Sequence, residues 1–178
     1  MSLPRGHLVL VGLPGAGKST VGRSVARKLR RPFLDFDVEL EHREGKSVAE
    51  LFAERGEAAF RALEVALTKE LVDTEPSVLA PGGGWITNPG VVQLLRPPAC
   101  IIHLRVSPAG ALKRLGSARV SRPLLMESDP ATVLDRLWAA REKLYASADG
   151  EIDTEVVDFQ QVADKVVLLA RGLDAGLA

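Results

Sequence analysis

The chain has 178 residues, of which 46% are hydrophobic and 26% are charged, and its formal net charge is zero. This composition is ordinary for a globular protein of a single domain, and the balanced charge gives no reason to expect a nucleic-acid partner. No apolar run approaches the ~20 residues that span a bilayer, no leader pattern opens the chain, and one cysteine forms no internal disulfide, so we expect a monomeric cytoplasmic protein with no membrane partner.

The first predicted elements flank a glycine-rich loop. Residues 8–11 predict a strand and residues 21–29 a helix. Between them lie Gly12, Leu13, Pro14, Gly15, Ala16, Gly17, Lys18, Ser19 and Thr20, which match the phosphate-binding pattern G-x-x-x-x-G-K-S. Glycines let backbone N–H groups turn toward phosphate oxygens, and the helix adds its positive N-terminal end. We therefore expect a bound nucleoside triphosphate, with Lys18 on its β- and γ-phosphates and Ser19 on Mg²⁺.

A second strand is predicted at 33–37, and it carries two carboxylates, Asp35 and Asp37. Parallel strands direct their carboxyl ends toward the ligand crevice, and residues two apart in a strand share a face. Both carboxylates should therefore lie beside the γ-phosphate, where they could hold Mg²⁺ through water or accept a proton from an attacking hydroxyl. The plainer alternative is a solvated strand end.

The next segment is helical, with predicted helices at 38–45, 48–54 and 57–73. Arg61 and Glu64 lie three residues apart on the last of these, a spacing that by itself favours an ordinary surface ion pair. A short strand at 77–80 then runs into Gly82, Gly83 and Gly84. Three glycines allow the backbone to approach a ligand closely, although a plain flexible turn is the alternative.

The remaining elements alternate in the same way. We predict helices at 88–95, 108–115, 130–146 and 159–171, strands at 100–106 and 151–153, and a mobile loop at 116–129. Strands that alternate with helices indicate an α/β fold with a five-stranded parallel sheet and helices on both faces. We expect one domain over 1–178, with an inserted helical region at 38–73.

In this order and spacing, several short runs resemble shikimate kinases along nearly the whole chain. They are 12–20, 33–37 with Glu41, 45–48, 56–57, 60–61 with Glu64, 82–84, 122–125 and 141–145. The resemblance implies a three-layer P-loop kinase fold in which 38–73 binds the acceptor and 116–129 closes as a lid. It also implies ATP-dependent phosphorylation of the 3-hydroxyl of shikimate, a step of aromatic amino acid biosynthesis, with Mg²⁺ as cofactor.

The resemblance further implies a role for individual residues. Shikimate would be held by Asp37, Arg61, Gly82, Gly83, Gly84 and Arg141, with the two arginines suited to its carboxylate. Asp37 would orient or deprotonate the attacking hydroxyl, and Asp35 would face Mg²⁺ through water, with Ser19 as its direct ligand. Lys18 and the lid arginine Arg122 would stabilise the transferring phosphoryl group, and Arg114 would lie near adenine. The catalytic residues are thus expected to be Lys18, Asp37 and Arg122.

Three departures from the family pattern stand out. Phe36 takes the place of the usual serine or threonine between the acids, and Trp85 follows the glycine triplet. Trp85 could line the substrate pocket or pack in the core. Residues 153–158 offer neither the arginine nor the proline that the family often has beside adenine.

Other functions remain to be weighed. A gluconate or nucleoside monophosphate kinase of the same architecture is the nearest alternative. A regulatory GTPase or a nucleic-acid-acting ATPase belongs to a different class, but Asn88 is the only asparagine and no Asn-Lys-x-Asp guanine motif exists. We expect His7, His42 and His103 to be structural or on the surface, and Cys100 to be buried.

Overall fold

The computed structural model describes residues 5–116, 125 and 129–176, and in these ranges the strands form one parallel sheet. The strands are β1 Leu8–Val11, β2 Phe33–Asp35, β3 Val78–Ala80, β4 Cys100–Arg105 and β5 Gly150–Asp153. Their order across the sheet is β2-β3-β1-β4-β5, and every neighbouring pair is parallel. The expected five-stranded parallel sheet is therefore confirmed, with β1 and its glycine loop in the middle.

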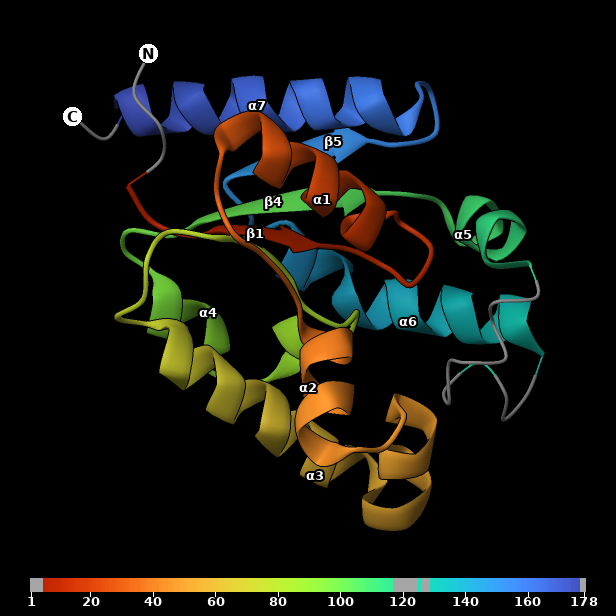
Figure 1. Ribbon diagram of the computed structural model, residues 1–178. Helices are drawn as coiled ribbons and strands as arrows, with labels where there is room; N and C mark the ends of the chain where they lie inside the picture. Colours follow the sequence, from red (N-terminus) through yellow and green to blue (C-terminus); the bar gives the residue numbers. More distant parts are fainter. Residues whose placement is uncertain (1–4, 117–124, 126–128, 177–178) are drawn as a thin grey trace.

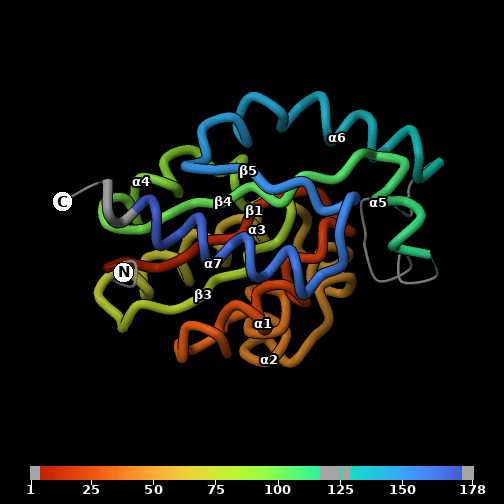
Figure 2. The backbone as a smooth tube through the Cα atoms, turned by 90° about the horizontal axis from the view of Figure 1, so that it is seen from above, coloured from red at the N-terminus to blue at the C-terminus, as the bar shows by residue number. Residues whose placement is uncertain are grey.

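Helices cover both faces of this sheet (Figures 1 and 2). They are α1 Lys18–Leu29, α2 Phe36–Glu44, α3 Val48–Leu71, α4 Val91–Leu95, α5 Pro108–Leu115, α6 Pro130–Tyr145 and α7 Phe159–Gly176, and the 3-10 turn η1 lies at Trp85–Thr87. Helices α1 and α7 pack against each other on one face, and α3 and α4 lie on the other (Figure 1). This is the three-layer P-loop kinase arrangement.

The two faces of the sheet have separate hydrophobic cores, because successive side chains of a strand point to opposite sides. In β1, Leu8 and Leu10 belong to the core under α1 and α7, whereas Val9 and Val11 belong to the core under α3 and α4. All four are buried. A strand buried on both faces reads as a continuous apolar run, which is why 8–11 shows no alternation.

Helix α3 is two helices joined at a kink. Its start is fixed by a capping box, in which Ser47 and Glu50 satisfy each other's backbone N–H groups. Gly56 has φ 78° and ψ 169°, a conformation outside the helix that glycine adopts without a Cβ clash. The predicted division of this region at Gly56 is confirmed, and it turns the second half of α3 toward the end of β3.

Several predicted boundaries are wrong, and the last helix, predicted at 159–171, continues to Gly176. The strand predicted at 33–37 ends at Asp35, which becomes the N-cap of α2, so Asp37 lies in the first turn of a helix. An acidic side chain is favoured there by the helix dipole. The helix predicted at 88–95 begins only at Val91, because Gly90 takes a left-handed conformation with φ 74°. Most of the loop predicted at 116–129 lies outside the described residues.

None of the helices in the described ranges is both long enough and apolar enough to cross a membrane.

Candidate functional site

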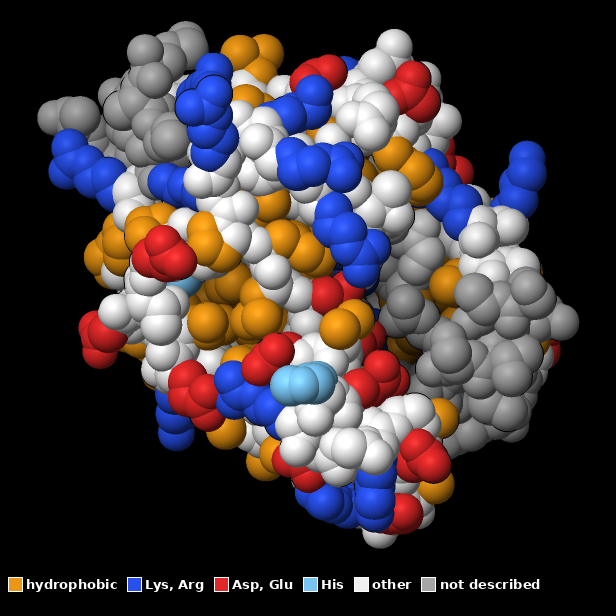
Figure 3. Space-filling model, viewed as in Figure 1, with side chains coloured by type: hydrophobic (Ala, Val, Ile, Leu, Met, Phe, Trp, Pro, Cys, Tyr) orange, Lys and Arg blue, Asp and Glu red, His pale blue; other side chains and the backbone are white. Residues whose placement is uncertain are grey.

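Some basic residues lie on the surface, whereas other charged residues line two cavities, which are described below. Figure 3 shows basic side chains gathered over α1, where Arg23, Arg27, Lys28 and Arg30 are exposed. None of these four lines either cavity. The charged groups that could act on a ligand therefore lie elsewhere, at the carboxyl ends of the strands.

The glycine loop forms one cavity of about 320 Å³. Gly17 adopts φ 92° at the N-cap of α1, and a Cβ there would lie 2.6 Å from the ring of Phe159. Lys18 opens the helix and is buried, and its Nζ donates to the carbonyl oxygens of Gly12 at 2.9 Å and Leu13 at 3.1 Å. The loop therefore holds a lysine ammonium and a helix N-terminus over the same space.

Some residues of the glycine loop line the cavities, and others are buried in the core. Gly15, Gly17, Lys18, Ser19 and Thr20 line the cavity just described. Leu13 and Ala16 are buried in the core under α1 and α7, and Pro14 lines the neighbouring cavity. The structure thus brings five of the nine predicted residues to one cavity. Leu13 and Ala16 instead anchor the loop to the hydrophobic core.

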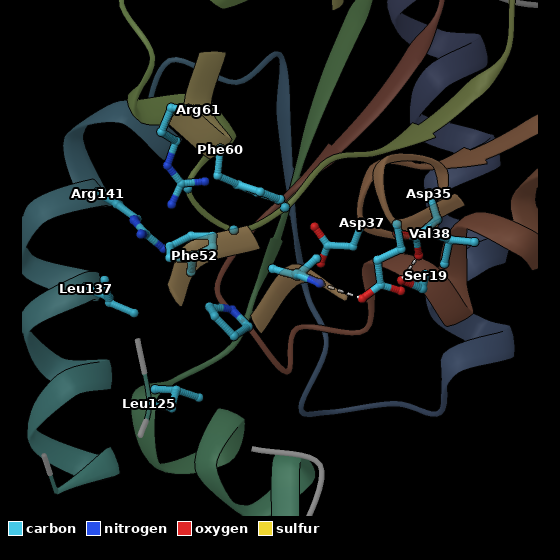
Figure 4. A pocket seen from close by; sticks show the side chains of 16 residues that line it. Ser19, Asp35, Asp37, Val38, Phe52, Phe60, Arg61, Leu125, Leu137 and Arg141 are labelled. Atoms are coloured by element: carbon cyan, nitrogen blue, oxygen red, sulfur yellow. Dashed lines mark hydrogen bonds between the residues drawn. The ribbon is translucent and has the colours of Figure 1, made fainter. Parts of the chain in front are cut away.

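A second cavity of about 310 Å³ opens beside the first, between α2, α3 and α6 (Figure 4). Arg61 and Arg141 lie at one end of it, and Ser19, Asp35 and Asp37 lie at the other (Figure 4). The wall between these ends is largely apolar and includes Val38, Val48, Phe52, Phe60, Leu125 and Leu137. A small ligand with an anionic end and a polar opposite end would fit this distribution.

The two cavities share four residues, Ser19, Asp35, Asp37 and Gly82. At this junction the Ser19 hydroxyl donates to Asp35 Oδ2 at 2.5 Å. Although Asp37 belongs to α2 rather than β2, it reaches the same junction as Asp35. Hydroxyl and carboxylate oxygens are the ligands that Mg²⁺ prefers, and the described residues contain no group of three or more acidic, histidine or cysteine side chains that could by itself hold a metal ion. Such a sparse set fits an ion that keeps waters and phosphate oxygens as its other ligands.

Arg61 is held in the second cavity by two glutamates of its own helix. Its guanidinium contacts Glu64 at 2.7 Å and Glu57 at 2.8 Å, and it lies 5.8 Å from the ring centres of Phe52 and Phe60. The Glu64 side chain is fully buried, so the surface ion pair that the spacing alone favoured is wrong. Burial raises the pKa of Glu64 to about 7, although the Arg61 guanidinium acts in the opposite direction.

The glycine triplet provides room for the charged side chains around it. A Cβ on Gly84 would lie 2.0 Å from Arg61 Nη2, and one on Gly83 would lie 3.4 Å from Arg141 Nη1. A Cβ on Gly82 would lie 2.8 Å from Glu64 Oε1 and 3.1 Å from Asp37 Oδ1. These glycines are therefore needed for close approach rather than for an unusual backbone conformation.

Arg114 also lines the first cavity. Its Nη1 donates to Thr154 Oγ1 at 2.7 Å, its Nη2 donates to the Thr154 carbonyl oxygen, and its guanidinium lies 5.0 Å from the centre of the Phe159 ring. Arg114 and Phe159 both line the cavity. Phe159 was missed from the sequence because, at the start of a helix, it reads as one more apolar residue.

The apolar wall of the second cavity was also missed. Phe52 and Phe60, on either side of the Gly56 kink, contact each other with tilted rings whose centres are 4.8 Å apart. The chain has only five phenylalanines, so two of them flanking a glycine was the one available signal.

Several other expectations have clear outcomes. Arg122 lies outside the described residues. Trp85 is fully buried and lines neither cavity, so it packs in the core. His7 and His103 are both buried. The His7 ring is hydrogen-bonded to the Leu71 carbonyl oxygen, and the His103 ring to the Glu151 carboxylate. Cys100 is also buried, as expected, and burial raises the pKa of its thiol to about 12.

Comparison with known proteins gives a consistent result. The sequence model of the shikimate kinase family matches residues 14–170. The shikimate kinase of Cupriavidus pinatubonensis is 41% identical over 169 residues, which cover 94% of this chain and 88% of that one. Among solved structures, the shikimate kinase from Acinetobacter baumannii in complex with shikimate superposes with a TM-score of 0.89 at 34% identity, covering 96% of this chain and 94% of that one. A gluconokinase from Sinorhizobium meliloti reaches a TM-score of 0.68 at 16% identity, covering 99% and 97% of the two chains, and so shares the fold alone.

Proposed function

The chain belongs to the shikimate kinase family, and we propose that it transfers the γ-phosphoryl group of ATP to the 3-hydroxyl of shikimate. The observation that carries the proposal is the junction of the two cavities at Ser19, Asp35, Asp37 and Gly82. One cavity has a phosphate-binding loop, the other has arginines suited to a carboxylate, and the two ligands would meet at two carboxylates. Residues 1–178 would act as one kinase domain.

In the acceptor cavity, Arg61 and Arg141 bind the shikimate carboxylate. A guanidinium presents paired N–H donors that match the two oxygens of a carboxylate. Both side chains are largely buried, so the charge interaction is weakly screened by water. Asp37 accepts hydrogen bonds from the ring hydroxyls at the other end, and the backbone of Gly82, Gly83 and Gly84 closes the site between them.

In the nucleotide cavity, the backbone of 12–20 binds the phosphates of ATP, and Lys18 reaches the β- and γ-phosphates. Arg114 and Phe159 offer a cationic plane and an aromatic ring at the end where the adenine base would lie. Ser19 would ligate Mg²⁺ directly and Asp35 through water. The ion, when bound, supplies positive charge that neutralises the phosphate oxygens.

Transfer then depends mostly on position and charge. Arg61 and Arg141 fix the acceptor so that its 3-hydroxyl faces the γ-phosphorus in line with the leaving oxygen. Asp37 orients that hydroxyl and accepts its proton, while Lys18 stabilises the charge on the phosphoryl oxygens. Arg122 would add a second positive charge, as the resemblance to the family implies. We also propose that the protein acts as a monomer in the cytoplasm.

An acceptor panel tests the proposal. Purified protein with ATP and Mg²⁺ is given shikimate, gluconate, AMP or no acceptor, and ADP release is followed. We expect rapid release with shikimate and little above the blank with the others. Turnover with gluconate or AMP that equals the turnover with shikimate would contradict the proposed acceptor, and release independent of any acceptor would favour a regulatory NTPase.

A further inference from the structure

Phe36 and Trp85, two of the three departures from the family pattern, are in contact with each other. Their rings meet edge to face, with centres 6.5 Å apart and an interplanar angle of 80°. Both side chains are fully buried. Phe36 directly precedes Asp37, and Trp85 directly follows Gly84. The contact therefore joins the first turn of α2 to the glycine triplet, two elements of the acceptor cavity that are far apart in sequence.

The indole of Trp85 also joins the triplet to the third element, α3. Its Nε1–H donates to Thr68 Oγ1 at 2.9 Å, and the Thr68 hydroxyl donates to the carbonyl oxygen of Glu64 at 2.7 Å. Thr68 and Glu64 are both fully buried. This indole–hydroxyl bond is a tertiary contact between residues 17 apart in the chain, at the helical turn that carries the Arg61–Glu64 ion pair.

A second connection runs beside the first. Asn88 Nδ2 donates to the carbonyl oxygen of Trp85 at 2.9 Å and approaches Glu64 Oε2 at 3.4 Å. The turn itself is closed by backbone bonds from Trp85 N to Gly82 O and from Thr87 N to Gly84 O, each 3.0 Å. Trp85 is thus attached to the glycine turn on one side and to Glu64 on the other.

We propose that Trp85 is a positioning residue for the acceptor, which fixes the Gly82–Gly84 backbone against α3 and α2 so that Arg61 and Asp37 face the cavity together. The proposal rests on the proposed function. Gly84 and Arg61 tolerate little relative movement, because the guanidinium lies where a Cβ of Gly84 would be. A turn that is free to shift would change this contact first. Trp85 does not line the nucleotide cavity, whose phosphate-binding loop lies between β1 and α1.

The test uses two substitutions that each remove the hydrogen bond between the Trp85 indole and the Thr68 hydroxyl. Trp85→Phe keeps an aromatic ring but loses the N–H group, and Thr68→Val keeps the shape but loses the hydroxyl. Each should raise the KM for shikimate by about three- to tenfold, the loss expected for one buried hydrogen bond. The KM for ATP should stay within about twofold, because the change does not reach the phosphate loop. The double variant should raise the KM by less than the product of the two single effects, since both substitutions remove the shared indole–hydroxyl bond.

Two controls separate positioning from general loosening of the fold. Thr68→Ser retains the hydroxyl and should restore the wild-type KM for shikimate. Val166→Ala removes packing in the other core, under α7, so it should lower the melting temperature without selectively raising the KM for shikimate.

The inference is overturned if Trp85→Phe and Thr68→Val leave the KM for shikimate unchanged, or if they raise the KM values for both substrates equally, as a general loss of stability would. It is likewise overturned if the fold increases in the KM for shikimate caused by the two substitutions multiply in the double variant. In all these cases the wild-type protein still phosphorylates shikimate, whereas a wild-type protein with no shikimate turnover overturns the proposed function itself.

Discussion

The guanidinium of Arg61 lies so close to the backbone of Gly84 that a Cβ at Gly84 would stand 2.0 Å from Nη2. Gly84→Ala should therefore displace Arg61 from the acceptor cavity. We expect the KM for shikimate to rise by about 10- to 100-fold, the usual effect of moving a binding group by roughly an ångström. The KM for ATP should change little. Gly172→Ala is the matched control, because nothing lies within 4 Å of its Cβ position, and steady-state kinetics with each substrate varied would show the difference.

Removing the Arg61 guanidinium should affect the acceptor alone. For Arg61→Ala we expect a rise in the KM for shikimate of about 100-fold or more, since a partly buried charge partner of a carboxylate is lost. ATP affinity, measured by calorimetry, should be nearly intact. Arg43→Ala removes an arginine with a similar pair of glutamate partners that lines neither cavity, and should leave both constants unchanged. Loss of ATP affinity with unchanged shikimate binding would contradict the assignment.

Asp37 should matter for the chemical step rather than for nucleotide binding. Asp37→Asn keeps the shape of the side chain but removes its charge and basicity, so we expect kcat to fall by about 100-fold or more while ATP still binds. Asp164→Asn, an exposed aspartate on α7, is the control for the substitution itself. An unchanged kcat in Asp37→Asn would remove this residue from catalysis.

Glu64 should take up protons when shikimate binds. Burial raises its pKa to about 7, and the Arg61 guanidinium holds that value down. When the shikimate carboxylate engages Arg61, this stabilisation of the ionised form weakens and the pKa of Glu64 rises further. At pH 7.5, without shikimate, the Glu64 carboxyl is mostly ionised. Shikimate binding should therefore be accompanied by uptake of a fraction of a proton by Glu64.

Calorimetric titrations in buffers of different ionisation enthalpy measure this uptake directly. Glu64→Gln should abolish it, because the amide does not titrate. The absence of proton uptake at pH 7.5 in the wild-type protein, or an equal uptake in Glu64→Gln, would show that Glu64 is not coupled to the acceptor.

Local patterns predicted the features that depend on neighbouring residues. The glycine loop, the order of strands and helices and the Gly56 division follow from spacing and backbone chemistry within a few residues. The parallel sheet follows from the alternation of strands and helices. The extent of β2 did not follow, because Phe33 to Asp37 alternates like a strand while the helix dipole and the capping position of Asp35 end the strand earlier.

Features that depend on tertiary packing were out of reach. Spacing on a helix cannot tell an exposed Arg–Glu pair from one whose glutamate is fully buried, as Glu64 is. Nor can it place Phe159 against Gly17, or Trp85 against Phe36, since each pair is brought together only by the sheet. The resemblance to a family supplied the acceptor residues, and the structure supplied the reason for the glycine triplet beside them.

The position of the new phosphate on the product tests the central claim most directly. Purified protein is incubated with ATP, Mg²⁺ and shikimate, and the product is examined by phosphorus–proton correlation NMR. The account predicts one phosphorylated product, in which phosphorus couples to the proton at carbon 3. Coupling at carbon 4 or 5 would contradict the proposed orientation by Arg61, Arg141 and Asp37, and ADP formation without phosphorylated shikimate would contradict the proposed function.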